Sequence, residues 1–544
     1  MNKPVFQLLS LLKIKISERY FNQLIFSHPE YPNMLSIVDT LERLGINHNV
    51  FRINKDDLTK LEFPFLLFLD DKSGKKGILI RNEKDLNQNK EEVKNWNGVV
   101  LQVDNDEGIK NTRNDEIKKS ISEARSFQLK SKLLAGCGIV LLALALINSF
   151  STVNTAFILT SLVGFLLGYL LIAKELGNTS EIIESFCKMG KKSNCDKILN
   201  SKEAKLFGII SFSDIVIIYF CFQLVAFCFS MALPNAFTSF YPLLLAMSLL
   251  TLPVILFSVY YQYFRAKVWC PLCLAVDAVL IAQTAILANV FYNQVIHLNN
   301  EVIFYTIVGL VIFGIIGLSV ILSKDKAEEI NHLSKAVILS QRIKYSSDVF
   351  THLLFQQRKI DDSAFNPEIL LGNPDAPLRI LMVSNFYCNP CKEQHVKIAQ
   401  LIHTYPEKVA VAIRFVRNGQ DFNRSLTTTG YIISYWLHKI YHQSEESSKT
   451  EKLLENWYKV MDLEKFIKEN LLEGDEKNNE SRIIEEQHYK WQEMVGISST
   501  PTFFINGHEL PNNYNIEDMM VLTPGLAEYF SMAPDSVLQD VEKN

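Results

Sequence analysis

The chain has 544 residues, 48% of them hydrophobic, and a formal net charge of −4. It is therefore too long for one ordinary hydrophobic core, and it lacks the positive excess that nucleic-acid binding requires. Apolar residues are concentrated in residues 133–322, whereas both flanks have the composition of soluble protein. We expect a multidomain protein in which a helical membrane domain lies between two soluble α/β domains.

Residues 1–128 predict a small α/β domain. Helical spacing in NMLSIVDTLERLG, which stops at Gly45, is followed by two apolar runs typical of strands, FPFLLFLDD and GILI. The first residues, MNKPVFQLLSLLKIKISERYF, have lysines within their apolar part and no small-residue cleavage site, so we expect no cleaved signal peptide. The domain has no cysteine, and we interpret His28 and His48 as surface residues rather than catalytic ones.

Residues 129–323 predict a transmembrane domain. Six apolar runs each approach the ~20 residues that cross a bilayer, and only STVN separates the first two. A single helix over both of those runs would be about 60 Å long, twice the thickness of the hydrocarbon layer, so we expect a hairpin. The predicted spans are 133–150, 155–173, 211–231, 240–264, 272–292 and 302–322.

The region after the last span predicts a linker and a second soluble domain. Residues 324–365 are charged with scattered apolar positions and predict an exposed helix, and 366–544 predict an α/β domain with a Lys/Glu-rich helical insertion at about 440–490. Within it, LRILMVSNFYCNPCKEQHVKIAQLIHTY predicts a strand, a turn and a helix that begins at the cysteines. Free N–H groups at a helix N-terminus favour a reactive sulfur at Cys388, and Cys391, one turn on, is placed to resolve a mixed disulfide.

The nine cysteines fall into two groups. Three lie within apolar runs, and we interpret them as buried small hydrophobic residues: Cys137, Cys221 and Cys228. The other six form three pairs, and two predicted spans separate each pair from the next. All three pairs therefore face one compartment, whichever way the chain is inserted. The pairs are Cys187 with Cys195, Cys270 with Cys273, and Cys388 with Cys391.

Zinc binding and structural crosslinking are the alternatives to redox chemistry at these pairs. A zinc site would need two further ligands, and only His395, four residues after CNPC, lies near a pair. A structural disulfide is the stronger alternative for Cys187 and Cys195. We favour electron exchange among the three pairs, and we predict no metal.

The C-terminal domain resembles the thioredoxin superfamily, and most closely the DsbA-like thiol–disulfide oxidoreductases. The resemblance rests on ILLGNPDAPLRI, on the CxxC after a strand, and on GISSTPTFFINGHEL about 110 residues later. It covers most of 366–544. It implies that Thr500 and Pro501, with the proline in a cis peptide bond, lie beside the active-site cysteines and hold the extended chain of the partner.

The membrane domain resembles the vitamin K epoxide reductase family, including its bacterial members. The resemblance rests on FCKMGKKSNCDKILNSKEAKLFGI, in which Ser201 follows the second cysteine by six residues, and on WCPLC at the start of a later span. It covers about 150–322 and implies a five-span core around a bound quinone, with 133–150 as an extra span. Joined to a thioredoxin-like domain, this set of motifs is specific.

The family resemblance also implies a role for each cysteine of the membrane domain. Cys195 exchanges with Cys270, and Cys273 faces the quinone. Cys187 exchanges with Cys388 of the thioredoxin-like domain. Electrons would then pass from a substrate dithiol through all three pairs.

Two carboxylates in the predicted spans are also candidate site residues. Asp277 stands four residues after the CxxC, where the vertebrate enzyme has a tyrosine that contacts the quinone, and this departure argues against vitamin K epoxide as the substrate. We predict that Asp277 lies in the quinone site. Asp214, near the start of the third span, is either a functional or paired carboxylate or an interfacial helix cap.

The N-terminal domain resembles the cysteine peptidase domains that process double-glycine leader peptides. The resemblance rests on HPEYPNMLSIVDTLERLGINHNVFRINKDDLTKLEFPFLLFLDD. Residues 1–128 lack the cysteine nucleophile, and the GILI strand lacks the histidine that such a domain carries there. The resemblance therefore implies a non-catalytic module that binds a peptide or the redox domain.

Together these features predict a multi-pass protein of the inner membrane that forms disulfides in exported proteins or peptides and passes electrons to menaquinone or ubiquinone. Disulfide formation favours cysteines in the periplasm, whereas the lysine-rich loops on the cysteine side favour the cytoplasm by the positive-inside rule. We give the redox argument more weight. Two alternatives remain: a maturation scaffold that recruits one peptide client through its N-terminal module, and a quinone or epoxide reductase driven by thiols.

Overall fold

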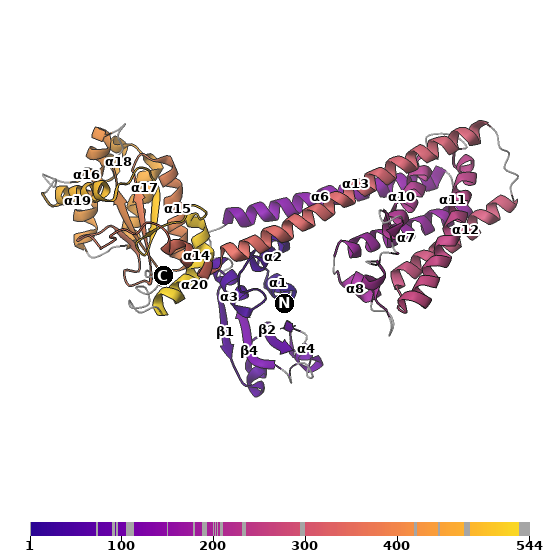
Figure 1. Ribbon diagram of the computed structural model, residues 1–544, viewed down its shortest axis with the longest axis horizontal. Coiled ribbons are helices and arrows are strands. Elements are labelled where there is room, and N and C mark those ends of the chain that lie inside the picture. The colour runs from indigo at the N-terminus through magenta and orange to yellow at the C-terminus, as the bar shows by residue number, and fades with distance from the viewer. Residues whose placement is uncertain are drawn as a thin grey trace. The chain divides into compact units, whose positions relative to one another are not determined.

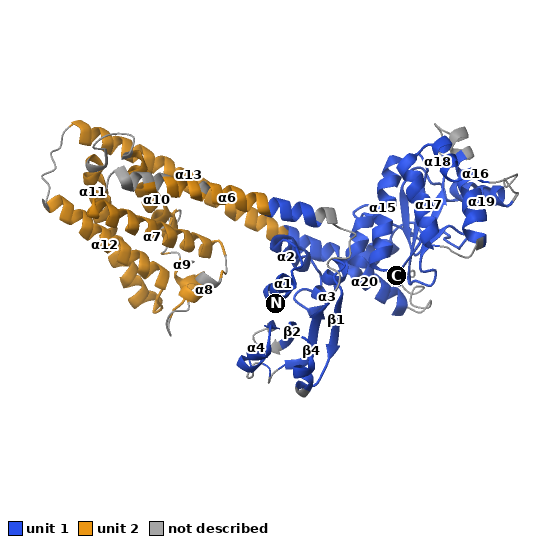
Figure 2. Ribbon diagram, turned by 180° about the vertical axis from the view of Figure 1, so that it is seen from behind, with its two compact units in different colours: residues 1–124, 337–544 blue, residues 125–336 orange. Residues whose placement is uncertain are grey.

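The structure is a computed structural model (Figure 1), and it describes most of residues 2–532. The chain divides into two compact units, one formed by residues 1–124 and 337–544 and the other by residues 125–336 (Figure 2). The residues outside the description are 1, 72–73, 90–92, 94–95, 105–113, 149–150, 178–179, 188–192, 200, 202, 204, 207–209, 231–235, 294–299, 418–421, 444–446, 473–478 and 533–544.

The N-terminal part of the first unit is a small α/β domain, as predicted. Helices pack on a four-stranded antiparallel sheet of order β1-β4-β2-β3. The predicted helix ends at Arg43, and Gly45, with φ 66°, adopts the left-handed backbone that turns the chain toward β1. The elements are α1 (Asn2–Leu11), α2 (Glu18–Phe26), α3 (Met34–Arg43), β1 (His48–Arg52), β2 (Phe65–Asp71), β3 (Gly74–Ile80), α4 (Glu83–Gln88) and β4 (Trp96–Val103).

The prediction that His28 lies on the surface is wrong. His28 is only 6% exposed, and its Nε2 lies 3.1 Å from Oδ2 of Asp39. The ring is buried because it follows α2 directly and packs beside α3, which carries Asp39. His48 is half-buried, and its Nδ1 lies 2.9 Å from the carbonyl oxygen of Ile46.

Five helices in the described part of the chain are long and apolar enough to cross a membrane. They correspond to five of the six predicted spans, and the last of them continues without a break into the predicted linker. The sixth predicted span, 133–150, falls in α6 (Asn114–Asn148) and extends past the described residues, so it stays a prediction. The five helices are α7 (Thr152–Glu175), α10 (Phe212–Ser230), α11 (Ala236–Tyr260), α12 (Pro271–Asn293) and α13 (Asn300–Lys344).

Close approach of α7 to α10 depends on two glycines. A Cβ added at Gly164 would overlap the Phe220 ring, and one at Gly168 would lie 3.2 Å from the Cα of Ile217. Small residues of this kind let helix backbones approach in membranes, where no hydrophobic force drives helices together.

A buried polar cluster also ties the bundle. Gln283 of α12 donates from Nε2 to Ser161 Oγ of α7 and to Gln223 Oε1 of α10, both at 2.9 Å. Ser161 in turn donates to Gln223 Oε1 at 2.7 Å. Because the three side chains satisfy one another, the cluster links three helices without leaving a polar group facing hydrocarbon.

The three cysteines outside the pairs are less buried than predicted. Cys137 is exposed, and Cys221 and Cys228 are half-buried. Among the described residues these side chains are not enclosed, and an apolar run in the sequence does not distinguish such a helix face from a core face.

The C-terminal domain is built on a five-stranded sheet of order β11-β10-β8-β9-β7, in which β8 and β9 are parallel. Helices α16 to α19 form the predicted insertion, which begins earlier than residue 440. The elements are α14 (Ser347–Phe355), β7 (Leu370–Gly372), β8 (Leu378–Ser384), α15 (Asn389–Thr404), β9 (Val409–Phe415), α16 (Phe422–Lys439), α17 (Ser447–Val460), α18 (Leu463–Glu469), α19 (Asn479–Val495), β10 (Thr502–Ile505), β11 (His508–Glu509) and α20 (Met519–Met532).

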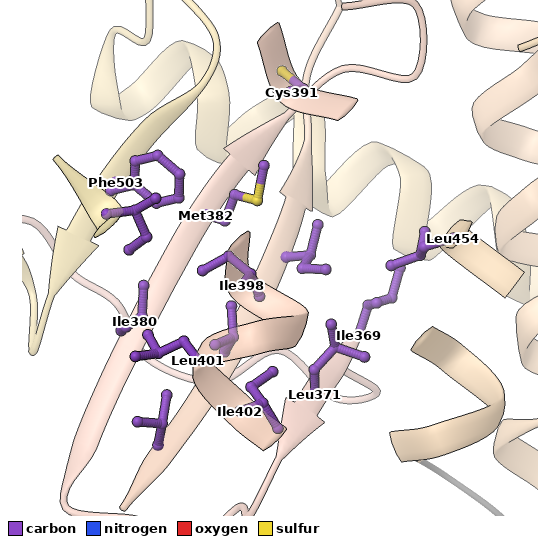
Figure 3. Packing of buried hydrophobic residues seen from close by; sticks show 14 of the residues in the cluster. Ile369, Leu371, Ile380, Met382, Cys391, Ile398, Leu401, Ile402, Leu454 and Phe503 are labelled. Carbon is purple, nitrogen blue, oxygen red and sulfur yellow. The ribbon is translucent and has the colours of Figure 1, made fainter. Parts of the chain in front are cut away.

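Strand alternation divides the core of this domain between the two faces of the sheet. Ile380 and Met382 of β8 face α15 and pack with Ile398, and Cys391 lies beyond Met382 at the start of that helix (Figure 3). The intervening residues of β8, such as Val383, pack on the opposite face. The strand thereby aims every second side chain at the helix that carries the CxxC.

The two soluble parts of the first unit are in contact. Lys408 Nζ, after α15, lies 3.1 Å from Glu42 Oε1 of α3. Arg342, near the end of α13, donates from Nε to the carbonyl oxygen of Phe26 at 2.6 Å, and its guanidinium lies 4.9 Å from the centroid of the Tyr31 ring.

Candidate active site

Cys388 and Cys391 lie at the start of α15, as the sequence predicts. Cys388 is the N-cap residue, and its Sγ accepts a hydrogen bond from the backbone N–H of Cys391 at 3.2 Å. Cys391 is fully buried, and this burial raises the pKa of its thiol to about 12. The pair therefore consists of an accessible sulfur supported by helix N–H groups and an enclosed thiol behind it.

Thr500 and Pro501 lie directly beside the first cysteine. The peptide bond between them is cis, and the carbonyl oxygen of Thr500 lies 3.6 Å from Cys388 Sγ. A pocket of about 520 Å³ extends from Pro501 and Thr502 past Gln394 and Lys397 of α15. The pocket thus begins at Pro501, next to the residue whose carbonyl oxygen lies beside Cys388.

The second pair opens α12. Cys270 immediately precedes the helix and Cys273 lies in its first turn, and both are buried. The two sulfurs are 2.6 Å apart, and the hydrogen bond from Cys273 to Cys270 lowers the pKa of Cys270. Among these two thiols, Cys270 is thus the one favoured as a nucleophile.

The third pair is joined by a disulfide between Cys187, at the end of α8 (Glu181–Cys187), and Cys195, at the start of α9 (Cys195–Leu199). The loop before Cys195 pairs with the segment before Cys270: Ser193 and Trp269 form a β-bridge, and the N–H of Asn194 donates to the carbonyl oxygen of Trp269 at 3.0 Å. Since Cys195 follows Asn194 and Cys270 follows Trp269, the two cysteines are held at neighbouring positions.

One buried apolar cluster encloses these four cysteines. Phe220 of α10 and Leu171 of α7 are fully buried in it. Cys187, Cys195, Cys270 and Cys273 belong to the same cluster, and the most exposed of them is only 8% exposed. Thiol exchange between them would be shielded from water.

Asp277 lies one turn beyond Cys273 and ends a chain of hydrogen bonds. Cys270 donates from its backbone N–H to Gln262 Oε1 at 2.7 Å, Gln262 donates to Ser258 Oγ at 3.1 Å, and Ser258 donates to Asp277 Oδ2 at 2.9 Å. The other carboxyl oxygen, Oδ1, is buried and has no hydrogen-bond partner among the described residues. Sequence reasoning missed Ser258 and Gln262, although their spacing of one helical turn in the preceding span was a usable signal.

Asp214 is both a helix cap and a paired carboxylate. Its Oδ2 accepts from the N–H of Ser211 at 2.9 Å, at the start of α10, and its Oδ1 lies 2.8 Å from Lys324 Nζ. The same ammonium lies 2.9 Å from Glu175 Oε1, at the end of α7. Asp214 is therefore a helix cap and a paired carboxylate at the same time, which the sequence analysis treated as alternatives.

Among the described residues, no hydrogen bond joins Ser201 to a cysteine of the three pairs. Its Oγ donates to the carbonyl oxygen of Ile198 at 2.8 Å and so closes the end of α9. Among the described residues, no group of three or more His, Cys, Asp or Glu side chains could hold a metal ion.

Comparison with known sequences defines two of the domains. Residues 155–288 match the vitamin K epoxide reductase family, and residues 365–522 match a thioredoxin family. The chain thus contains a vitamin K epoxide reductase family domain followed by a thioredoxin-like domain, and together with the five apolar helices this indicates a membrane protein that acts on thiols. No curated protein matches the chain.

Three of the solved structures that are similar to part of the chain are bacterial proteins. The catalytic domain of ScsC from Proteus mirabilis has 16% sequence identity and a TM-score of 0.25, and the match covers 33% of this chain and 94% of that one. Oxidised BdbD from Bacillus subtilis has 14% identity and a TM-score of 0.25, with 32% and 97% covered. Reduced DsbA1 from Neisseria meningitidis has 14% identity and a TM-score of 0.24, with 30% and 94% covered.

Proposed function

We propose that this protein is a quinone-dependent membrane oxidoreductase that forms disulfides in exported proteins or peptides. One substrate thiol opens the Cys388–Cys391 disulfide by attack on Cys388, and the second substrate thiol then displaces Cys388, which leaves a substrate disulfide and a reduced domain. The reduced domain is then reoxidised by the Cys187–Cys195 disulfide, and that pair by Cys270 and Cys273. Quinones lie well above thiol couples in potential, and for two electrons ~30 mV corresponds to about 1.4 kcal/mol, so electrons flow from thiol to quinone.

The observation that carries the proposal is the backbone pairing of Ser193 and Asn194 with Trp269. It supports direct exchange between Cys195 and Cys270, because each is the next residue along its segment. The lowered pKa of Cys270 supports its role as the sulfur that exchanges, with Cys273 on the quinone side.

The residues around Cys273 fit a quinone site. The carboxyl oxygen of Asp277 that has no partner among the described residues fits a group that takes up protons as it accepts electrons. When bound, a menaquinone or ubiquinone would supply the two-electron acceptor. Asp277 would hold one end of it, and Ser258 and Gln262 would fix the carboxyl group relative to Cys270.

The order of transfer is tested by single-turnover reoxidation. In Cys195→Ala, with the full chain reduced and a short-chain quinone added, we expect Cys388 and Cys391 to stay reduced, because the loop disulfide cannot form. Cys221→Ala, which removes a half-buried cysteine outside the pairs, is the control and should behave as wild type. Reoxidation of Cys195→Ala at the wild-type rate would exclude the proposed order.

Disulfide formation further implies cysteine pairs that face the periplasm of an inner membrane, since disulfides persist outside the cytosol. The lysine bias of the cysteine-side loops opposes this orientation. Labelling with a membrane-impermeant thiol reagent decides between the two sides.

A second function, recruitment of one peptide client by the N-terminal module, is favoured by the contacts of Glu42 with Lys408 and of Arg342 with Tyr31. These contacts would hold a bound client near the thioredoxin-like domain. If the module selects clients, deletion of residues 1–128 should slow oxidation of some dithiol peptides and not others. An equal rate for every peptide tested would rule the selector out.

A further inference from the structure

The buried thiol Cys391 must exchange a proton in each cycle of the proposed dithiol chemistry. When a mixed disulfide forms at Cys388, the Cys391 thiolate attacks Cys388 Sγ. The Cys388–Cys391 bond forms, the bond to the partner's sulfur breaks, and the partner leaves as a thiolate that takes up a proton. Cys391 is fully buried, so its own proton needs a path through the protein.

The buried carboxylates described in this domain are not free to accept that proton. Asp518 pairs with Lys344 at 2.7 Å. The Glu368 carboxylate is held by Arg379 at 2.8 Å and Arg414 at 3.5 Å. Ile380 and Met382, the β8 residues that face α15 and that Figure 3 labels, are apolar and offer no proton acceptor, and Met382 lies nearer to Cys391.

A different set of polar groups lies behind the cysteines. Ser384, at the end of β8, is fully buried, and its Oγ lies 2.9 Å from the Tyr458 hydroxyl of α17 and 3.2 Å from His395 Nε2 of α15. The Tyr458 hydroxyl also donates to the carbonyl oxygen of Asn385 at 3.3 Å. Three proton-carrying groups thus form one continuous chain.

One end of this hydrogen-bonded chain, Tyr458, lies in the core with Cys391, and the other end, His395, lies at a pocket. Tyr458 is 3% exposed and belongs to the same buried cluster as Cys391, and burial raises the pKa of its hydroxyl. His395 lies one helical turn after Cys391 and lines a pocket of about 380 Å³ beside α15 and α17.

The charged groups around that pocket come from the same two helices. Lys392 and His403 lie on α15, and Glu451, Glu455 and Lys459 lie on α17. His403 Nε2 lies 2.9 Å from Glu451 Oε1, and Lys459 Nζ lies 2.8 Å from Glu455 Oε1. Burial lowers the pKa of His395 to about 3, so the ring stays neutral near neutral pH and can pass a proton between its two nitrogens without storing it.

We infer that Tyr458, Ser384 and His395 form a proton relay between the buried thiol Cys391 and the pocket beside α15, in place of a buried carboxylate. The relay takes the proton from Cys391 when a mixed disulfide is resolved. It returns a proton when a substrate thiol opens the Cys388–Cys391 disulfide. This inference rests on the proposed exchange at Cys388.

The test is the lifetime of the mixed disulfide at Cys388 in the full-length protein. Oxidised protein is mixed with glutathione, quenched with acid at set times, and the glutathionylated Cys388 peptide is measured by mass spectrometry across the pH range. We expect Tyr458→Phe and His395→Gln each to lengthen that lifetime about 100-fold at neutral pH, the lower end of the 10²–10⁴-fold that proton transfer by a positioned group contributes. The slowing should lessen as the pH rises and hydroxide replaces the relay.

Two readouts separate a relay from a merely structural role. Alkylation of reduced Cys388, which needs no proton from Cys391, should keep its wild-type rate in both variants. Added imidazole should shorten the lifetime in His395→Ala, because His395 lines the pocket beside α15 and its truncation leaves room there for a small base. His403→Gln, on the same helix and the same pocket, is the matched control and should resolve the mixed disulfide at the wild-type rate.

An unchanged lifetime in Tyr458→Phe and His395→Gln would overturn the relay and leave the proposed exchange standing. Equal slowing of alkylation and resolution would also overturn it. If no mixed disulfide forms at Cys388 in the wild type, the proposed function fails and the relay fails with it.

Discussion

Two cysteines of one helical turn differ chemically because their surroundings differ. Cys391 is enclosed and its pKa is raised to about 12, chiefly by burial, whereas Cys388 is the half-buried N-cap beside Thr500. A thiol remains protonated below its pKa, so Cys391 should be inert at about pH 8. We expect iodoacetamide to modify Cys388 of the reduced chain and to spare Cys391, as measured by peptide mass spectrometry. Comparable alkylation of both would contradict the assigned burial.

His488 makes the stability of the C-terminal domain depend on pH. Its ring is 1% exposed and its Nδ1 accepts from the N–H of Phe415 at 3.0 Å, and burial lowers its pKa to about 3. The unfolded chain binds a proton near pH 6.5 and the folded chain does not, so stability is full above that pH and falls as the pH drops toward 3.

Because of His488, the free energy of unfolding of the C-terminal domain should fall by about 2 kcal/mol between pH 6.5 and pH 5, at about 1.4 kcal/mol per unit of pH. Urea unfolding of the full chain, followed by proteolysis of the C-terminal domain, measures it. The His488→Gln variant keeps a hydrogen-bond acceptor for the N–H of Phe415 but has no ring to protonate. Its free energy of unfolding should therefore fall by about 2 kcal/mol less than that of the wild type between pH 6.5 and pH 5. The same pH dependence in the variant would show that other groups cause it.

At the scale of helices, a buried ion cluster joins three of them at one end of the bundle. Lys324 of α13 is 8% exposed and pairs with Asp214 of α10 and Glu175 of α7. Loss of one partner from such a cluster leaves uncompensated charge in a low-dielectric site, which costs about 3–5 kcal/mol.

We therefore expect Lys324→Met to destabilise the membrane domain by about 3–5 kcal/mol, as measured by detergent-induced unfolding. Lys326→Met, two residues on, removes a 76% exposed ammonium paired with Glu329 and should cost less than about 1 kcal/mol. Equal effects of the two substitutions would mean that the cluster does not hold the helices together.

The elements were predictable to different degrees. Local periodicity and residue spacing can be read directly from the sequence. They predict the membrane spans, the helices that begin at the CxxC motifs, and the strand before Cys388. The pairing of Lys324 with Glu175, 149 residues away, and the adjacency of Cys195 and Cys270 depend on which helices pack together, and hydropathy does not encode that choice. His28 was misplaced for the same reason, because its burial depends on α3.

For the whole molecule, the number of membrane crossings decides which parts share a compartment. Six spans would place Cys388 and the N-terminal module on one side. We expect a membrane-impermeant thiol reagent to label Cys388 in intact, reduced cells, and an impermeant protease to remove a tag fused to the N-terminus. Labelling only after lysis would mean that the lysine bias sets the orientation. Labelling of Cys388 with protection of the tag would mean an odd number of crossings, with 133–150 not spanning.

The ion pair between Glu42 and Lys408 also has a consequence for biosynthesis. The two residues are 366 positions apart. At about 5–20 residues per second, a ribosome needs roughly 20–70 s to reach Lys408 after it has made Glu42. During that interval, α3 has been synthesised while its partner surface has not, and the whole membrane domain is inserted in between. The N-terminal domain, which has a buried core of its own, is therefore without this ion pair until the last third of the chain has been made.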